Sequence, residues 1–283
     1  MTGALVVARH ALEEAFRRRV FAVVLVLTVA FLALYRLGAG KVFAEVGGVG
    51  IPEEVDDRTL AGATLLGLAM FGTLFLGAVL AVFLTLGAVR GDAERGLLQP
   101  LVVRPLGRPW FLAGRFLAAG VVSGVYVFVV YAAAAVLTRE AGGWWPDAFV
   151  APGLELAGAA LILVAISLLG SVVLSPTANG IAVFMVYGAG LVAGLMGQIG
   201  VALRSETLTS VARTTSKVLP FEALYQDALH RITEDTGGVE QFVLELGPFG
   251  GSQAASGGLL LWAAAYVALI FLATVALFAR RDL

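Results

Sequence analysis

The sequence contains no cysteine, and charged residues make up only 14% of its 283 positions. The lack of cysteine excludes disulfide bonds, thiolate metal sites and cysteine nucleophiles. The net charge is −1, so no basic excess favours binding to nucleic acid. The two histidines, His10 and His230, are far apart in the sequence, and the topology predicted below places them on opposite sides of a membrane. We therefore expect no histidine metal site.

Apolar residues dominate what remains. They make up 59% of the chain, and the mean hydropathy is +0.93, well above the values typical of a soluble domain. Six apolar runs are each long enough to cross ~30 Å of hydrocarbon, and they cover residues 20–37, 60–89, 110–137, 152–174, 178–201 and 257–279. The sequence therefore predicts an all-α membrane protein with a single transmembrane domain over residues 1–283.

Two amphipathic helices are predicted beside the spans. Residues 2–19 carry apolar side chains at helical spacing, which favours an interfacial helix, although they are also compatible with a polar start of the first span. The second helix follows Pro220, within a long segment of residues 202–256. We expect its apolar face to lie on the membrane or on the spans, and that face consists of Phe221, Leu224, Tyr225, Ala228, Leu229 and Ile232.

The positions of the arginines predict the orientation. With six spans, most arginines near span ends fall on one side, which is cytoplasmic by the positive-inside rule: Arg9, Arg17, Arg18, Arg19, Arg90, Arg95, Arg104, Arg108, Arg115, Arg280 and Arg281. The prediction is a multi-pass protein of the inner (plasma) membrane with both termini in the cytoplasm. Residues 90–109 then form a cytoplasmic segment, and residues 202–256 lie outside.

The predicted span interiors contain essentially no charge, which disfavours a proton- or ion-coupled carrier, because such carriers use buried ionisable groups. We expect the hydroxyl groups of the spans to bond to backbone carbonyls or neighbouring helices. Three glycine pairs with G-x-x-x-G spacing begin at Gly87, Gly120 and Gly190. Internal helix packing is the expected role of these pairs, and a dimer seam is the alternative.

The chain lacks a phosphate-binding loop. Such a loop needs Gly-x-x-x-x-Gly-Lys-Ser/Thr, so that backbone amides and an ammonium group surround the phosphates. Neither lysine, Lys41 or Lys217, lies in that pattern. We therefore expect no ATPase site and no cofactor in this chain.

The predicted cytoplasmic segment between spans two and three is the most informative stretch. Residues 91–108 read GDAERGLLQPLVVRPLGR, in which charged ends flank a short apolar core. A short helix outside the membrane with Leu97, Leu98 and Leu101 among arginines is a suitable docking surface for a soluble partner. The alternative is an ordinary arginine-rich loop.

This stretch resembles the Glu-x-Gly-Thr-Leu-Glu-x-Leu-Leu-x-x-Pro-x-x-Arg pattern of type-2 ABC transporter permeases (the ABC-2 family), which include the nitrous-oxide-reductase maturation permease. Leu97 replaces the usual threonine, and Gln99 replaces the usual glutamate. By this resemblance the ATPase-coupling residues are Glu94, Arg95, Gly96, Leu98, Leu101, Arg104, Pro105 and Arg108.

The resemblance implies a permease subunit that catalyses nothing itself. Two such subunits are expected to form the pore as a homodimer in membrane lipid, and two separate ABC ATPase subunits are expected to bind ATP and Mg²⁺. Export is implied because type-2 permeases are mostly exporters. The sequence does not identify the substrate. The alternatives are a six-span carrier or channel that is not driven by ATP, and a membrane anchor or assembly factor that binds its partner through residues 202–256.

Overall fold

The computed structural model describes residues 13, 19–45, 57–86, 108–234 and 257–280. This part of the chain is helical apart from short turns and connections. Its eight helices are α2 (Arg19–Glu45), α3 (Asp57–Thr85), α6 (Arg108–Gly142), α7 (Val150–Val173), α8 (Pro176–Ala202), α9 (Glu206–Val218), α10 (Pro220–Arg231) and α12 (Leu259–Ala279).

Six of these helices confirm the predicted all-α membrane architecture. Helices α2, α3, α6, α7, α8 and α12 are long and apolar enough to cross a membrane. Within lipid, a helix is the structure that satisfies every backbone polar group inside one segment. The largest extensions beyond the apolar runs are those of α2, which continues to Glu45, and of α6, which continues to Gly142. The chain is therefore a multi-pass membrane protein.

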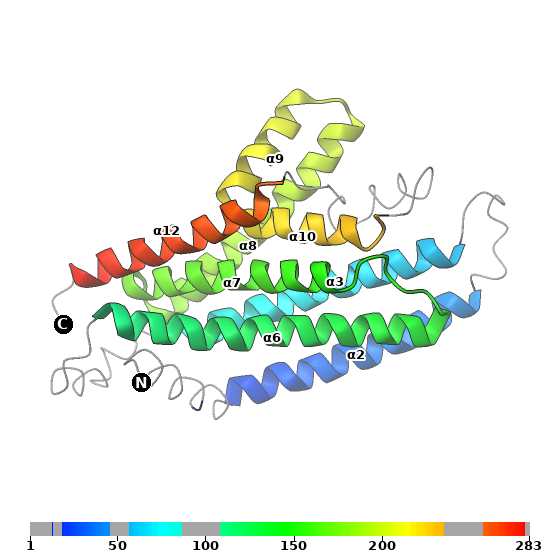
Figure 1. Ribbon diagram of the computed structural model, residues 1–283, viewed down its shortest axis with the longest axis horizontal. Coiled ribbons are helices and arrows are strands. Elements are labelled where there is room, and N and C mark those ends of the chain that lie inside the picture. Colours follow the sequence, from blue (N-terminus) through cyan, green and yellow to red (C-terminus); the bar gives the residue numbers. More distant parts are fainter. Residues whose placement is uncertain (1–12, 14–18, 46–56, 87–107, 235–256, 281–283) are drawn as a thin grey trace.

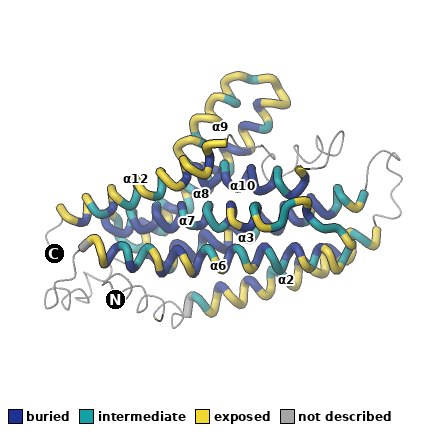
Figure 2. Tube along the Cα trace, viewed as in Figure 1, coloured by how far each residue is buried: buried dark blue, intermediate teal, exposed yellow. Residues whose placement is uncertain are grey.

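Helix α7 forms the centre of the elongated bundle. It packs against α3, α6, α8, α10 and α12, and its side chains Leu156, Ile162 and Leu163 are completely buried. Helix α2 lies at the edge, against α3 and α6 (Figure 1). Figure 2 shows much of α3 and α7 as buried, whereas α2, α9 and α12 are largely exposed. The exposed side chains of α2 and α12 are mostly apolar, as lipid contact requires.

Helix ends are set by local sequence signals. Ser175 caps α8, because its Oγ accepts a hydrogen bond from the Ala178 amide at 3.4 Å, and Pro176 occupies the first turn, where its missing N–H costs nothing. Beyond the end of α6, Gly143 adopts a φ of 76°, a conformation in which a side chain would be strained.

Close helix packing accounts for two of the three glycine pairs. A Cβ on Gly120 would overlap Leu161 of α7, and a Cβ on Gly190 would overlap the Phe221 ring of α10. For these two pairs the expectation of internal packing is confirmed. The pair that begins at Gly87 lies outside the described residues.

The predicted outer helix is confirmed as α10, which begins at Pro220. It packs on α7, and nearly all of its residues are buried, so the spans and not the membrane cover it. The sequence did not predict α9. This helix returns along α8 from the turn at residues 203–205, and the α8–α9 hairpin projects from the bundle (Figure 1).

Candidate functional site

The predicted coupling residues from Glu94 to Pro105 lie outside the described residues, as does nearly all of the predicted interfacial helix of residues 2–19. Arg108 is the first residue of α6. The segment of residues 87–107 therefore joins the end of α3 to the start of α6. The structure shows what holds these two helix ends.

An apolar cluster fixes the start of α6. Phe111 and Leu112 pack against Leu168 and Val172 at the end of α7 and against Phe278 at the end of α12. The rings of Phe111 and Phe278 are 6.4 Å apart. A force on the start of α6 thus acts on the ends of α7 and α12.

A polar node fixes the end of α3. The Thr85 hydroxyl donates to Ser167 Oγ of α7 at 2.6 Å, and the Asn179 amide of α8 donates to the Ser167 carbonyl at 2.9 Å. All three residues are buried. We call Thr85, Ser167 and Asn179 the α3–α7–α8 node. It joins the helix that leads into residues 87–107 to the central helix and to the start of α8.

Helix α2 is bound to α6 by two pairs of hydroxyl groups, Thr28 with Tyr126 and Tyr35 with Thr138. The oxygen atoms are 2.5 Å apart in each pair. The expectation that span hydroxyls bond to carbonyls or neighbouring helices is confirmed for these residues and for Thr85. For Thr73 and Ser123, no hydrogen-bond partner is found within the described part of the chain.

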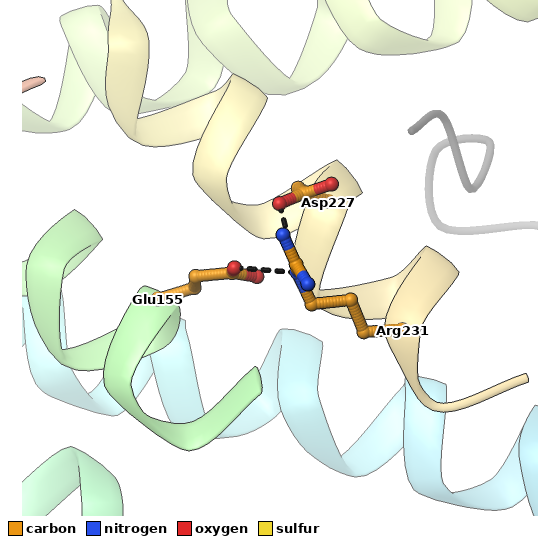
Figure 3. Close-up of polar contacts among 3 residues, drawn as sticks. All are labelled: Glu155, Asp227 and Arg231. Atoms are coloured by element: carbon orange, nitrogen blue, oxygen red, sulfur yellow. Dashed lines mark hydrogen bonds and ion pairs between the residues drawn. The ribbon is translucent and has the colours of Figure 1, made fainter. Parts of the chain in front are cut away.

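The prediction of charge-free spans is wrong at Glu155. This residue lies in α7, and its side chain is only 4% exposed. Its Oε1 is 2.7 Å from Nε of Arg231 on α10, and the same Nε donates to Asp227 Oδ2 at 3.0 Å (Figure 3). One guanidinium group thus serves two buried carboxylates. The glutamate was visible in the sequence, but its partner comes from a distant helix.

The ion pair changes the argument about transport. An isolated buried carboxylate in a span would suggest an ion pathway. Here the carboxylate of Glu155 is paired with Arg231, and the pair binds α10 to the central helix. A buried charge is therefore present, but it is used for helix packing.

Helix α10, which is not one of the six spans, carries another buried carboxylate. This is Glu222, which is only 2% exposed. It accepts a hydrogen bond from Gln226, and its Oε2 accepts one from Ser216 of α9 at 3.2 Å. Burial raises the pKa of Glu222 to about 7, while the two hydrogen bonds oppose that shift. A Cβ on Gly194 of α8 would overlap this carboxylate, so Glu222 lies where α8, α9 and α10 meet.

No family model matches the chain. A stretch of 130 residues, 46% of this chain, is 31% identical to a protein of Stutzerimonas stutzeri named "Probable ABC transporter permease protein NosY". The match covers 43% of that relative, so the chain spans less than half of its length. The chain is therefore similar, over part of its length, to a probable ABC transporter permease.

Proposed function

We propose that the chain is the transmembrane permease subunit of an ATP-driven ABC exporter and that a separate ATPase subunit binds ATP and Mg²⁺. The observation that carries this proposal is the similarity to a probable ABC transporter permease. The six apolar helices support it, because a permease must cross the membrane several times. Export follows from the resemblance of residues 94–108 to type-2 permeases.

In this proposal the ATPase binds the segment between α3 and α6, through Glu94, Arg95, Gly96, Leu98, Leu101, Arg104, Pro105 and Arg108. The ATPase has different affinities for two arrangements of the spans, and this difference lets nucleotide shift their equilibrium. The α3–α7–α8 node and the cluster around Phe111 support such coupling, because they connect both ends of the segment to α7. The side of the membrane that holds this segment and both termini is then cytoplasmic.

A second copy of the chain completes the pore in this proposal. Helix α8 carries an exposed apolar stripe that contains Ile181, Met185, Val192, Met196 and Ile199. These residues recur at helical spacing on one face. A two-fold dimer buries the same surface on both subunits, so the stripe of one copy packs against that of the other.

Charge reversal in the coupling segment tests the docking surface. We expect Arg104→Glu and Arg108→Glu to reduce the amount of ATPase that co-purifies with the protein, because each places a carboxylate in a basic surface. Arg36→Glu, on the exposed surface of α2, is the matched control. If the coupling variants retain as much ATPase as the control, the assigned docking surface is wrong.

Cysteine cross-linking tests the dimer, and the natural sequence has no cysteine to give a background. Met185 is 70% exposed on α8, and Leu261 is 77% exposed on α12. We expect Met185→Cys to form a disulfide-linked dimer under mild oxidation in membranes and Leu261→Cys not to do so. Cross-linking through Leu261→Cys alone would contradict the assignment of α8 to the interface.

A further inference from the structure

A groove of about 1050 Å³ lies between the α8–α9 hairpin, α10 and the first half of α12. Its apolar wall is formed by α12, with Trp262, Tyr266, Leu269 and Ile270. Trp262 and Tyr266 pack edge to face, and their ring centroids are 6.2 Å apart. Neither the proposed ATPase docking segment nor the proposed dimer interface on α8 includes this groove.

The opposite wall is basic. Thr209, Arg213 and Lys217 line the groove from α9, and because they are four residues apart they lie on one face of that helix. No aspartate or glutamate lines the groove in the part of the chain that the structure describes. The groove therefore has two cationic side chains opposite an apolar wall.

The cations lie at one end of the apolar wall. Trp262 Nε1 donates a hydrogen bond to the Lys217 carbonyl at 2.9 Å, which holds the end of α9 against the first turn of α12. From Leu259 to Ile270 the helix rises about 16 Å, close to the ~15 Å of hydrocarbon in one leaflet. Tryptophan and tyrosine near the start of a span are typical of the membrane interface.

We propose that this groove binds an anionic phospholipid from the leaflet in which α12 begins. The phosphate group lies between Arg213 and Lys217, and one acyl chain lies along Tyr266, Leu269 and Ile270. The charge selects an acidic headgroup, and the length of the wall suits a chain that ends near the middle of the bilayer. The bound lipid joins the α8–α9 hairpin to α12 on the open side of the groove.

Native mass spectrometry of the full-length protein in detergent tests this site, with phosphatidylglycerol and phosphatidylcholine of the same acyl chains as probes. We expect the natural protein to bind phosphatidylglycerol more tightly than phosphatidylcholine. In the variant Arg213→Gln/Lys217→Gln, the affinity for phosphatidylglycerol should fall by about fivefold per cation removed. The matched control is Arg36→Gln/Lys41→Gln, which removes one arginine and one lysine from the exposed surface of α2. This control should bind as the natural protein does.

A second pair of variants tests the acyl-chain site and needs no charge change. Leu269 is 55% exposed and lines the groove, whereas Leu272 is 62% exposed on the same helix and does not. Leu269→Trp should fill the apolar part and weaken binding of both lipids, and Leu272→Trp should not. Equal affinity for the two lipids in the natural protein would overturn the proposal. An equal loss of phosphatidylglycerol affinity in the α2 control would also overturn it. A third contrary result is a change of oligomeric state in Arg213→Gln/Lys217→Gln with unchanged lipid binding, because a second copy of the chain would then fill the groove. None of these outcomes depends on an ATPase.

Discussion

Removal of Arg231 should destabilise the protein more than the loss of an ordinary surface charge. Arg231→Leu leaves Glu155 and Asp227 buried near each other without their shared cation. Loss of one partner from a buried ion pair costs about 3–5 kcal/mol. Because the Arg231 side chain is 34% exposed, we expect the lower end of that range.

The assay is a denaturing-detergent titration that measures the free energy of unfolding, with Arg36→Leu as the surface control. A double-mutant cycle separates lost packing from the uncompensated charge. We expect Glu155→Gln in the Arg231→Leu background to restore part of the lost stability, because it removes one unpaired carboxylate. The reasoning is refuted if Arg231→Leu costs no more than Arg36→Leu, or if Glu155→Gln adds a further loss.

Three other predictions follow from buried contacts. The raised pKa of Glu222, about 7 against 4.5 in the unfolded chain, means that the folded state binds the proton more tightly. The contribution of Glu222 to the free energy of unfolding is therefore complete below pH 4.5 and is lost as pH rises through about 7, a change of about 3 kcal/mol. When the free energy of unfolding is measured against pH, the Glu222→Gln variant should lack this decrease. Gly190→Ala should cost about 1–3 kcal/mol by overpacking against Phe221, whereas Gly38→Ala on α2, with open space around its Cβ, should be neutral or stabilising. Equal effects in thermal unfolding would contradict this packing. Thr85→Val should cost about 1 kcal/mol and reduce transport-coupled ATPase activity. Thr274→Val, whose hydroxyl donates to the Ile270 carbonyl of its own helix, should leave that activity unchanged in reconstituted vesicles.

The sequence predicted those elements whose signal is local. Six spans follow from long apolar runs, and α10 follows from Pro220 and the apolar spacing after it. The sequence analysis did not predict helix α9, because its sequence, ETLTSVARTTSKV, is polar. The position of this helix depends on packing against α8. In that packing, Gly197 and Gly200 of α8 admit Ala212 and Leu208.

The buried charges show a different limit. Glu155 lies within an apolar run, so composition alone treats it as an exception, and the pairing with Arg231 depends on how α10 docks on α7. Glu222 has the same difficulty in part. Gln226 lies four residues further along α10 and meets it as soon as that helix forms, but Ser216 meets it only when α9 packs against α10. The docking segment has the opposite character, because its pattern is readable in sequence while residues 94–105 lie outside the described structure.

In the proposed function this chain works with a separate ATPase. The most direct measurement is purification of the tagged protein from its native cell in mild detergent, followed by identification of the proteins that accompany it and an assay of ATP hydrolysis. We expect a soluble subunit with a phosphate-binding loop, and ATPase activity that Arg104→Glu removes from the purified complex. A protein that purifies alone from several detergents, without ATPase activity, would contradict it.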